Sequence, residues 1–202
     1  MKTKIMSIKT KAIRMAVIAG LIAMSFLPSG ALAGEGFLLA SPAFEEGGVM
    51  PSDFSCEGDS ESPPLEWSNP PEGTKYYALS LWHNAPDKVK SYWILYNIPS
   101  EVNSLPKGSK DIGIFGLNTR RLPEYQPMCA KGTVAHTYTI SFFALSEKAE
   151  FATDQVTRDL LLDGIKDITL AEYTFAYQFS RTIPEGSQSA AEPKARRAPP
   201  KK

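Results

Sequence analysis

Four runs of aromatic and aliphatic residues, each bounded by turn-forming Pro, Gly or Asn, constrain the fold of this 202-residue chain most strongly. In the third run Tyr138, Ile140 and Phe142 alternate with polar residues, and the fourth has four aromatic rings at every second position. A period of two is typical of a strand with one buried face. Residues 83–91 contain Asn, Pro and Asp and can close the first two runs as an antiparallel pair. The predicted strands are 74–82, 92–98, 137–145 and 172–180.

One further stretch predicts a helix. Thr153 or Asp154 can cap its first turn, and apolar residues follow at helical spacing until about Lys166. The fold class is therefore mainly β with one or two short peripheral helices. Residues 100–132 lack a regular pattern, and a loop of that length in a compact domain is usually functional or pinned. Cys129 is the candidate pin.

The charge divides the chain into three pieces. Residues 1–33 carry five basic residues and no acid, and residues 185–202 carry five basic residues and two acids. The remaining 12 basic residues and 20 acids give the central piece, 34–184, a formal charge of −8. Nucleic acid attracts clustered Lys and Arg, so no nucleic-acid partner is expected. The central piece is predicted to be the folded domain, and 185–202 a disordered basic tail.

The N-terminal piece has the order of a secretory signal peptide. Basic residues up to Arg14 precede an apolar run, 16–27, and the small-x-small tripeptide Ala31-Leu32-Ala33. The alternative is a membrane anchor, but the run is shorter than the roughly 20 residues that a span needs. We therefore predict cleavage after Ala33, a periplasmic or secreted protein, and no transmembrane span after processing.

Export makes the two cysteines informative. Cys56 and Cys129 lie 73 positions apart, without CxxC or zinc-site spacing, and two cysteines cannot complete a four-ligand structural metal site. In an oxidising compartment a disulfide between them is the expected state. The alternative is a pair of separate buried thiols.

Common catalytic signatures are absent from the sequence. It contains no G-x-S-x-G, P-loop, G-x-G-x-x-G or H-E-x-x-H motif, and its two histidines, His83 and His136, have no metal-site spacing. We therefore expect no enzyme activity, no cofactor and no metal. Hydrolysis through His136 and nearby hydroxyls is a minor alternative. His83 is expected to be an exposed loop residue, and His136 is either a ligand-binding residue or a histidine satisfied at the rim of the sheet.

Six short phrases, in order and covering about 37–181, begin at Ser41 (SPAF), Phe54 (FSCEG), Ser62 (SPPLEW), Pro71 (PEGTK), Tyr96 (YNIP) and His136 (HTY). Together they resemble the phosphatidylethanolamine-binding protein family, in particular its bacterial, Raf-kinase-inhibitor-like branch. The resemblance implies a large antiparallel sheet, a second smaller sheet, peripheral helices, and a surface pocket for phosphate or a phospholipid headgroup. It also places Cys56 and Cys129 where exported bacterial members look able to form a disulfide.

The sequence departs from the family at the expected pocket. Trp82 and Asn84 stand where the family's Asp-Pro-Asp-x-Pro loop has its two aspartates, and Tyr92 stands where a His precedes a Trp. Gln126-Pro127 replaces a Gly-Pro pair, whereas the His and Tyr of the last phrase are retained. For Trp82, Asn84 and Tyr92 a packing or turn role is the alternative to ligand contact. The candidate ligand-binding residues are His136, Tyr138, Tyr92, Trp82, Asn84 and Pro127.

These observations predict an exported binding module with an altered pocket for a small anion or a phospholipid headgroup. A His N–H and a Tyr hydroxyl two residues apart on one strand face can reach one ligand. The alternative is an envelope protein-interaction or inhibitor protein that acts through surface loops on an unidentified partner, with a vestigial pocket.

Overall fold

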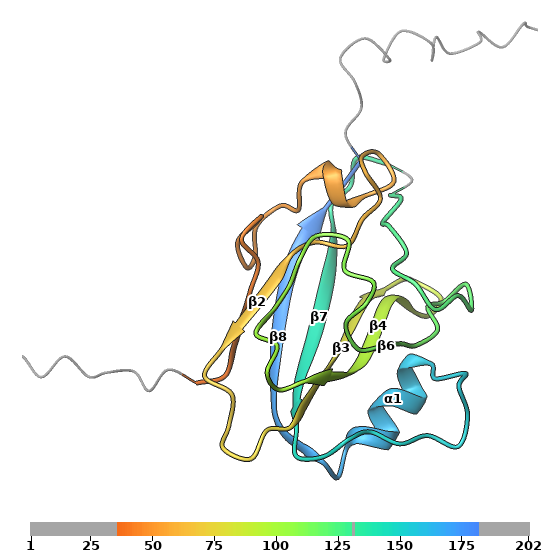
Figure 1. Ribbon diagram of the computed structural model, residues 1–202. Helices are drawn as coiled ribbons and strands as arrows, with labels where there is room; N and C mark the ends of the chain where they lie inside the picture. Colours follow the sequence, from red (N-terminus) through yellow and green to blue (C-terminus); the bar gives the residue numbers. More distant parts are fainter. Residues whose placement is uncertain (1–35, 131, 182–202) are drawn as a thin grey trace, which may run out of the picture. The chain divides into compact units, whose positions relative to one another are not determined.

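The computed structural model describes residues 36–130 and 132–181, which form two antiparallel sheets and one α-helix (Figure 1). The proposed signal peptide, 1–33, and the basic tail, 185–202, lie outside these described residues. The mainly β class with a large and a small sheet is confirmed.

The large sheet contains the four predicted strands and one short addition. Its order is β6-β4-β3-β7-β8, and every neighbouring pair is antiparallel. Chain segments that are far apart in sequence meet here, since β3 lies between β4 and β7. The bounds are β3 Tyr76–Asn84, β4 Val89–Pro99, β6 Ile114–Phe115, β7 His136–Leu145 and β8 Thr169–Phe179.

The β3–β4 hairpin is tighter than the predicted connection 83–91. Asn84 pairs with Val89, and the N–H of Ala85 donates to the carbonyl of Lys88 at 2.9 Å. Strand pairing therefore continues through most of the residues predicted to be loop, and only 85–88 make the turn. The prediction that His83 is a loop residue is wrong for the same reason.

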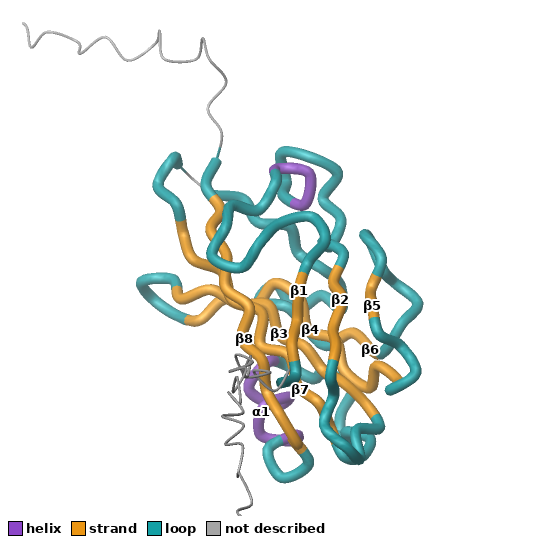
Figure 2. Tube along the Cα trace, turned by 90° about the vertical axis from the view of Figure 1, so that its left-hand side faces the viewer, coloured by secondary structure: helices purple, strands orange, loops and turns teal. Residues whose placement is uncertain are grey.

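The small sheet covers one face of the large one. Its strands are β1 (Leu38–Ala40), β2 (Leu65–Ser68) and β5 (Ser104–Leu105), which lie side by side in Figure 2. Trp67 of β2 packs 4.8 Å from the Phe142 ring and 5.2 Å from the Tyr77 ring. The main hydrophobic core thus lies between the two sheets, as expected for layered β packing.

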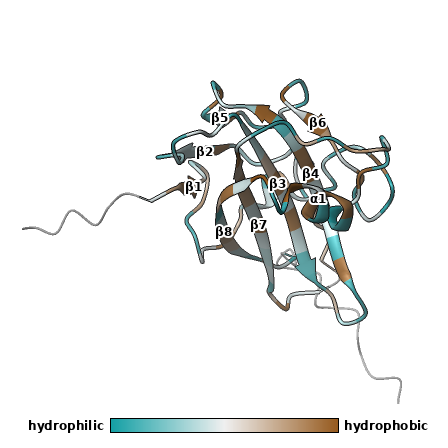
Figure 3. Ribbon diagram, turned by 90° about the horizontal axis from the view of Figure 1, so that it is seen from below, coloured by the Kyte–Doolittle hydropathy of each residue, from teal (hydrophilic) through white to brown (hydrophobic). Residues whose placement is uncertain are grey.

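Helix α1 (Arg158–Ile165) covers the opposite face of the large sheet, over β3 and β4 (Figure 3). The helix begins later than predicted. The Thr153 hydroxyl accepts from the N–H of Gln155, two residues on, so it closes a turn instead of capping a helix. Thr157 is extended and its side chain accepts from the N–H of Leu160, which makes it the N-cap.

Two irregularities interrupt the β3–β4 ladder, one between Tyr77 and Leu79 and one between Leu81 and Trp82. The first places Asn97 at a positive φ of 55° and buries its side chain. Its amide donates to the carbonyl of Ala149 at 3.0 Å and accepts from the Ala149 N–H at 2.8 Å. Asn97 therefore connects the sheet to the segment that leads to α1.

A disulfide joins Cys56 to Cys129, with the two Cα atoms 5.5 Å apart. The adjacent residues Ser55 and Met128 form a parallel bridge, and the Cys56 N–H donates to the Met128 carbonyl at 3.1 Å. The prediction that Cys129 pins the end of the long segment 100–132 is confirmed.

Substitution of Asn97 by Ala should lower the free energy of unfolding by about 3 kcal/mol. It leaves two buried backbone groups of Ala149 without their partner and puts a Cβ without a compensating amide at positive φ. Urea unfolding checks this value. Asn97→Gly is the control. It loses the same two hydrogen bonds as Asn97→Ala, but glycine adopts the positive φ without strain, so it should cost about 1 kcal/mol less. Equal costs for Ala and Gly would contradict a contribution from the positive φ.

Replacing both cysteines by serine should also destabilise the fold. The bond closes a loop with a sequence separation of 73, which the chain-entropy relation converts to about 4 kcal/mol. Chemical unfolding with and without reductant measures the loss. Reductant should shift the wild type to the midpoint of the double variant and leave that variant unchanged; a wild type that reductant does not shift would contradict the prediction.

Candidate functional site

Four ring side chains gather at one end of β3, β4 and β7, and we call them the four-ring cluster: His83, Tyr92, His136 and Tyr138. The Tyr138 ring stacks on His83 with centroids 5.0 Å apart and meets the edge of Tyr92 at 5.4 Å. The rings of His83 and His136 are 5.3 Å apart, edge to face. Tyr138 is the buried floor of the cluster and His136 its exposed rim.

Strand alternation explains how β3 and β7 supply three of these rings. His136 and Tyr138 are two residues apart on β7, so they share a face. On β3, His83 follows the core residues Leu79 and Leu81 at the same spacing. His83 Nδ1 lies 3.0 Å from the carbonyl of Thr137, which fixes the imidazole against β7.

The fourth ring depends on the second irregularity of the β3–β4 ladder. Leu81 pairs with Trp93 whereas Trp82 pairs with Ser91, so Tyr92 is an extra residue on β4. Such a bulge turns the extra side chain out of simple alternation. Tyr92 and Trp93 both belong to the core between the sheets, although they are consecutive.

The two tyrosines of the cluster are in edge-to-face ring contact, and each changes the pKa of the other. Burial raises the pKa of Tyr138 far above its ordinary value, and neighbouring Tyr92 raises it further. Burial also raises the pKa of Tyr92, against the opposing effects of neighbouring Tyr138 and Arg120. Both hydroxyls therefore stay protonated at neutral pH and can act as uncharged hydrogen-bond donors.

The structure brings together three of the predicted residues, His136, Tyr138 and Tyr92. Pro127 is half-buried beside them, since the N–H of its neighbour Gln126 donates to the carbonyl of Tyr92 at 2.7 Å. The residue that sequence reasoning missed is His83. Its spacing from Leu79 and Leu81 was the available signal, and the adjacent turn-forming residues obscured it.

Two predicted residues do not join the cluster. Trp82 lies on the opposite face of the sheet, where its Nε1 donates to the hydroxyl of Ser141 at 3.3 Å. The guanidinium of Arg158, the first residue of α1, lies 4.8 Å from the Trp82 ring. Asn84 is exposed and ends the strand at the hairpin. Packing and turn roles thus account for both positions.

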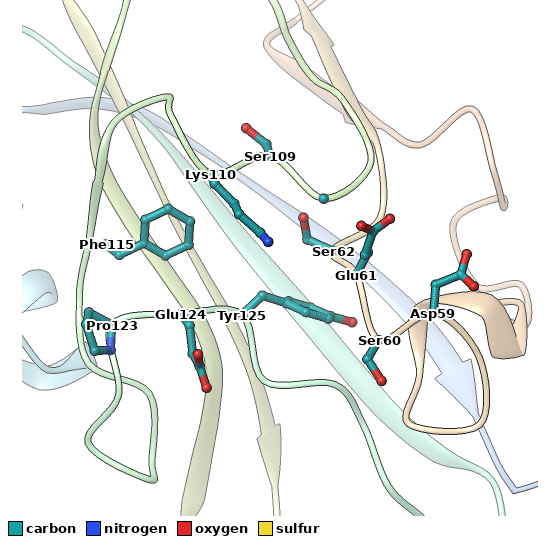
Figure 4. Close-up of a pocket in the computed structure, with 11 residues that line it drawn as sticks. Asp59, Ser60, Glu61, Ser62, Ser109, Lys110, Phe115, Pro123, Glu124 and Tyr125 are labelled. Atoms are coloured by element: carbon teal, nitrogen blue, oxygen red, sulfur yellow. The ribbon is translucent and has the colours of Figure 1, made fainter.

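A separate cavity of about 520 Å³ has Tyr125 among its lining residues (Figure 4). Its wall carries the carboxylates of Asp59, Glu61 and Glu124 against one ammonium group, that of Lys110. The Tyr125 hydroxyl donates to the carbonyl of Phe54 at 2.6 Å, so it is already engaged. The excess of carboxylates disfavours an anion in this cavity, and none of the predicted ligand-binding residues lines it.

Over 36–130 and 132–181 there is no group of three or more His, Cys, Asp or Glu side chains that could hold a metal ion. None of the helices in that part of the chain has the length and apolar character to cross a membrane.

The fold and the cluster define a class: a two-sheet β protein with an aromatic and imidazole-lined site at the edge of its large sheet. The profile described as phosphatidylethanolamine-binding protein matches residues 40–180, and the chain belongs to that family. A UPF0098 protein of Chlamydia trachomatis is 30% identical over 149 residues, which are 69% of this chain and 97% of that protein. A UPF0098 protein of Chlamydia pneumoniae is 31% identical over 134 residues, 63% of this chain and 88% of that protein.

Solved structures agree with this assignment. A phosphatidylethanolamine-binding protein homologue from Chlamydia trachomatis superposes with a TM-score of 0.68 and 27% identity, covering 73% of this chain and 99% of that one. YbcL of Escherichia coli, at 23% identity and a TM-score of 0.66, covers 72% and 99% of the two chains and shares the fold. A Mycobacterium tuberculosis protein named as a lipoprotein, LppC, is 31% identical over 118 residues, 56% of this chain and 57% of that protein.

Alkaline pH should destabilise the fold through the two cluster phenols. Because the pKa values of Tyr92 and Tyr138 are raised in the folded state, the folded chain keeps protons that the unfolded chain releases above about pH 10. Their contribution to stability is complete below about pH 10 and is lost as the pH rises beyond it.

Urea unfolding at about pH 8 and about pH 11 measures this loss. The double variant Tyr92→Phe/Tyr138→Phe should lose less stability between these pH values than the wild type, by up to about 1.4 kcal/mol per phenol and pH unit. Equal losses in the two proteins would contradict the assignment.

Proposed function

We propose that this chain is an exported, non-enzymatic binding module whose four-ring cluster receives a small anion, either phosphate or a phosphoryl headgroup. The observation that carries the proposal is the gathering of the Tyr92 phenol and the exposed His136 imidazole around the stacked rings of Tyr138 and His83. A phenolic O–H and an imidazole N–H are uncharged donors that can hold phosphate oxygens.

Charge supports the same ligand. Trp82 and Asn84 occupy the positions of the two family aspartates, so the repulsion that those carboxylates would exert on an anion is absent from them. Arg120 lies close enough to lower the pKa of Tyr92, and it adds a positive charge near the cluster.

Gln126 offers a complementary acceptor. Its backbone bonds to Tyr92, and its side-chain oxygen is buried without a hydrogen-bond partner among the described residues. An unsatisfied buried acceptor gains from a ligand that brings a donor. A protonated phosphate oxygen or the ammonium group of phosphoethanolamine supplies one.

Export is supported by the signal-like sequence of residues 1–33 and by a relative named as a lipoprotein. Binding in place of catalysis is supported by the absence of common catalytic motifs from the sequence.

Thermal-shift titration with phosphate, phosphoethanolamine and a short-chain phospholipid tests the site. A ligand at a hundredfold its Kd should stabilise the wild type by about 2.7 kcal/mol, and each kcal/mol raises Tm by roughly 2–4 °C. Tyr92→Phe and His136→Ala should each weaken binding about five- to tenfold, since each removes one donor.

Tyr76→Phe is the matched control, because it removes a half-buried tyrosine hydroxyl at the far end of β3. It should leave the titration unchanged. A folded wild type that no probe stabilises would overturn the anion site and favour the alternative, an interaction protein acting through its surface loops.

A further inference from the structure

A basic pocket of about 410 Å³ lies on the α1 side of the large sheet, opposite the face that carries the four-ring cluster. Three cations from three separate segments line it: Lys88 of the β3–β4 hairpin, Arg121 of the long segment after β6, and Arg158 of α1. The single acid in its lining is Asp159, whose side chain is 96% exposed. Glu172, outside the lining, also interacts electrostatically with Arg158, and the pocket keeps a net positive charge.

Arg158 is held in the wall of this pocket by Trp82. Its guanidinium stacks 4.8 Å from the Trp82 ring, and 19% of the side chain is exposed. The Nε atom is buried without an acceptor among the described residues, and Asp159 is only at the edge of ion-pair range, 4.0 Å from Nη1. Burial lowers the pKa of Arg158. A partly desolvated guanidinium with unmet donors gains from an oxyanion with several acceptor oxygens.

Arg121 is presented by a turn that a buried amide holds in shape. The residue has a φ of 65°, which is unfavourable for a side chain with a Cβ. The Asn118 side-chain oxygen accepts from the N–H groups of Arg120 and Leu122, and the Asn118 carbonyl accepts from Arg121 at 2.8 Å. Asn118 is 2% exposed. The Asn118 hydrogen bonds thus hold Arg121 in its strained backbone conformation, and such strained residues are often found at ligand-binding sites.

Hydroxyl groups complete the lining. The Thr119 oxygen accepts from the N–H of Ser91 at 2.7 Å, and the Thr157 oxygen accepts from the N–H of Leu160. Both hydroxyl protons are then free to donate towards the pocket that these residues line. The first turn of α1 adds the partial positive charge of a helix N-terminus to the side-chain charges.

We propose that this basic pocket is a second binding site, specific for phosphate oxyanions, in which Arg158 and Arg121 supply planar donor pairs and Lys88 a third charge. Guanidinium groups match the geometry of phosphate oxygens better than single ammonium groups. The volume accommodates a phosphomonoester or the headgroup of an acidic lipid. The site is independent of the four-ring cluster, since Trp82 and His83 point to opposite faces of β3.

Residue-resolved NMR titration of ¹⁵N-labelled protein with inorganic phosphate and with glycerol 3-phosphate tests this site. The backbone amides of Thr119, Arg121, Arg158 and Asp159 should shift saturably. The double variant Lys88→Gln/Arg121→Gln should weaken their apparent affinity at least tenfold, because both side chains are exposed and their loss leaves the core intact. Lys110→Gln, an exposed lysine of the acidic cavity, is the matched control and should change nothing.

This experiment tests the basic pocket and the four-ring cluster separately. Tyr92→Phe should leave the four amides responsive, whereas shifts around His83 and His136 report on the four-ring cluster alone. Absence of saturable shifts at the four amides with either probe, or equal weakening by Lys110→Gln, overturns the basic pocket.

Vesicles distinguish the two sources of the phosphate group. Co-sedimentation with phosphatidylcholine vesicles containing phosphatidylglycerol, lost in Lys88→Gln/Arg121→Gln, identifies a lipid headgroup as the ligand. Binding of glycerol 3-phosphate without binding to these vesicles identifies a soluble phosphate ester. Arg158→Lys keeps the charge and should still weaken both, since it removes the planar donor pair.

Discussion

The pairing of β3 with β4 is the constraint on which the rest of the structure depends. β4 is buried along eight consecutive residues, with the small sheet on one side and the α1 layer on the other. The two bulges of β4 direct side chains from this strand pair to neighbouring elements. One turns Tyr92 towards β7 and the four-ring cluster, and the other turns Asn97 towards Ala149 and the segment before α1. A regular ladder would direct neither side chain in this way.

Neighbouring residues at the end of β3 serve opposite faces of the sheet. Trp82 faces α1 and stacks on Arg158, whereas His83 faces β7 and stacks on Tyr138. The two side chains therefore have different neighbours: His83 packs in the four-ring cluster, and half-buried Trp82 supports a guanidinium on the other face.

Sequence reasoning predicted the four long strands. Two follow from the alternation of apolar and polar residues, and two from continuous aromatic and aliphatic runs bounded by turn-forming residues. It placed the start of α1 three or four residues early, since Thr153, Asp154 and Thr157 are all acceptable caps and only the tertiary contacts select one. The bulge at Tyr92 left no local signal, because an extra aromatic residue in an apolar strand looks the same in either register. His83 was missed because the turn-forming residues after it outweighed the alternation before it.

The Cys56–Cys129 bond has a consequence for proteolysis of the folded protein. Much of the irregular backbone, including the turn that carries Arg121, lies between these two cysteines. A protease that cleaves the chain once anywhere in that interval produces two fragments that remain covalently joined. The parallel bridge of Ser55 and Met128 lies next to the disulfide and adds backbone pairing at this junction. A single cut in a surface loop of this interval therefore does not release either fragment, because the disulfide still joins the two.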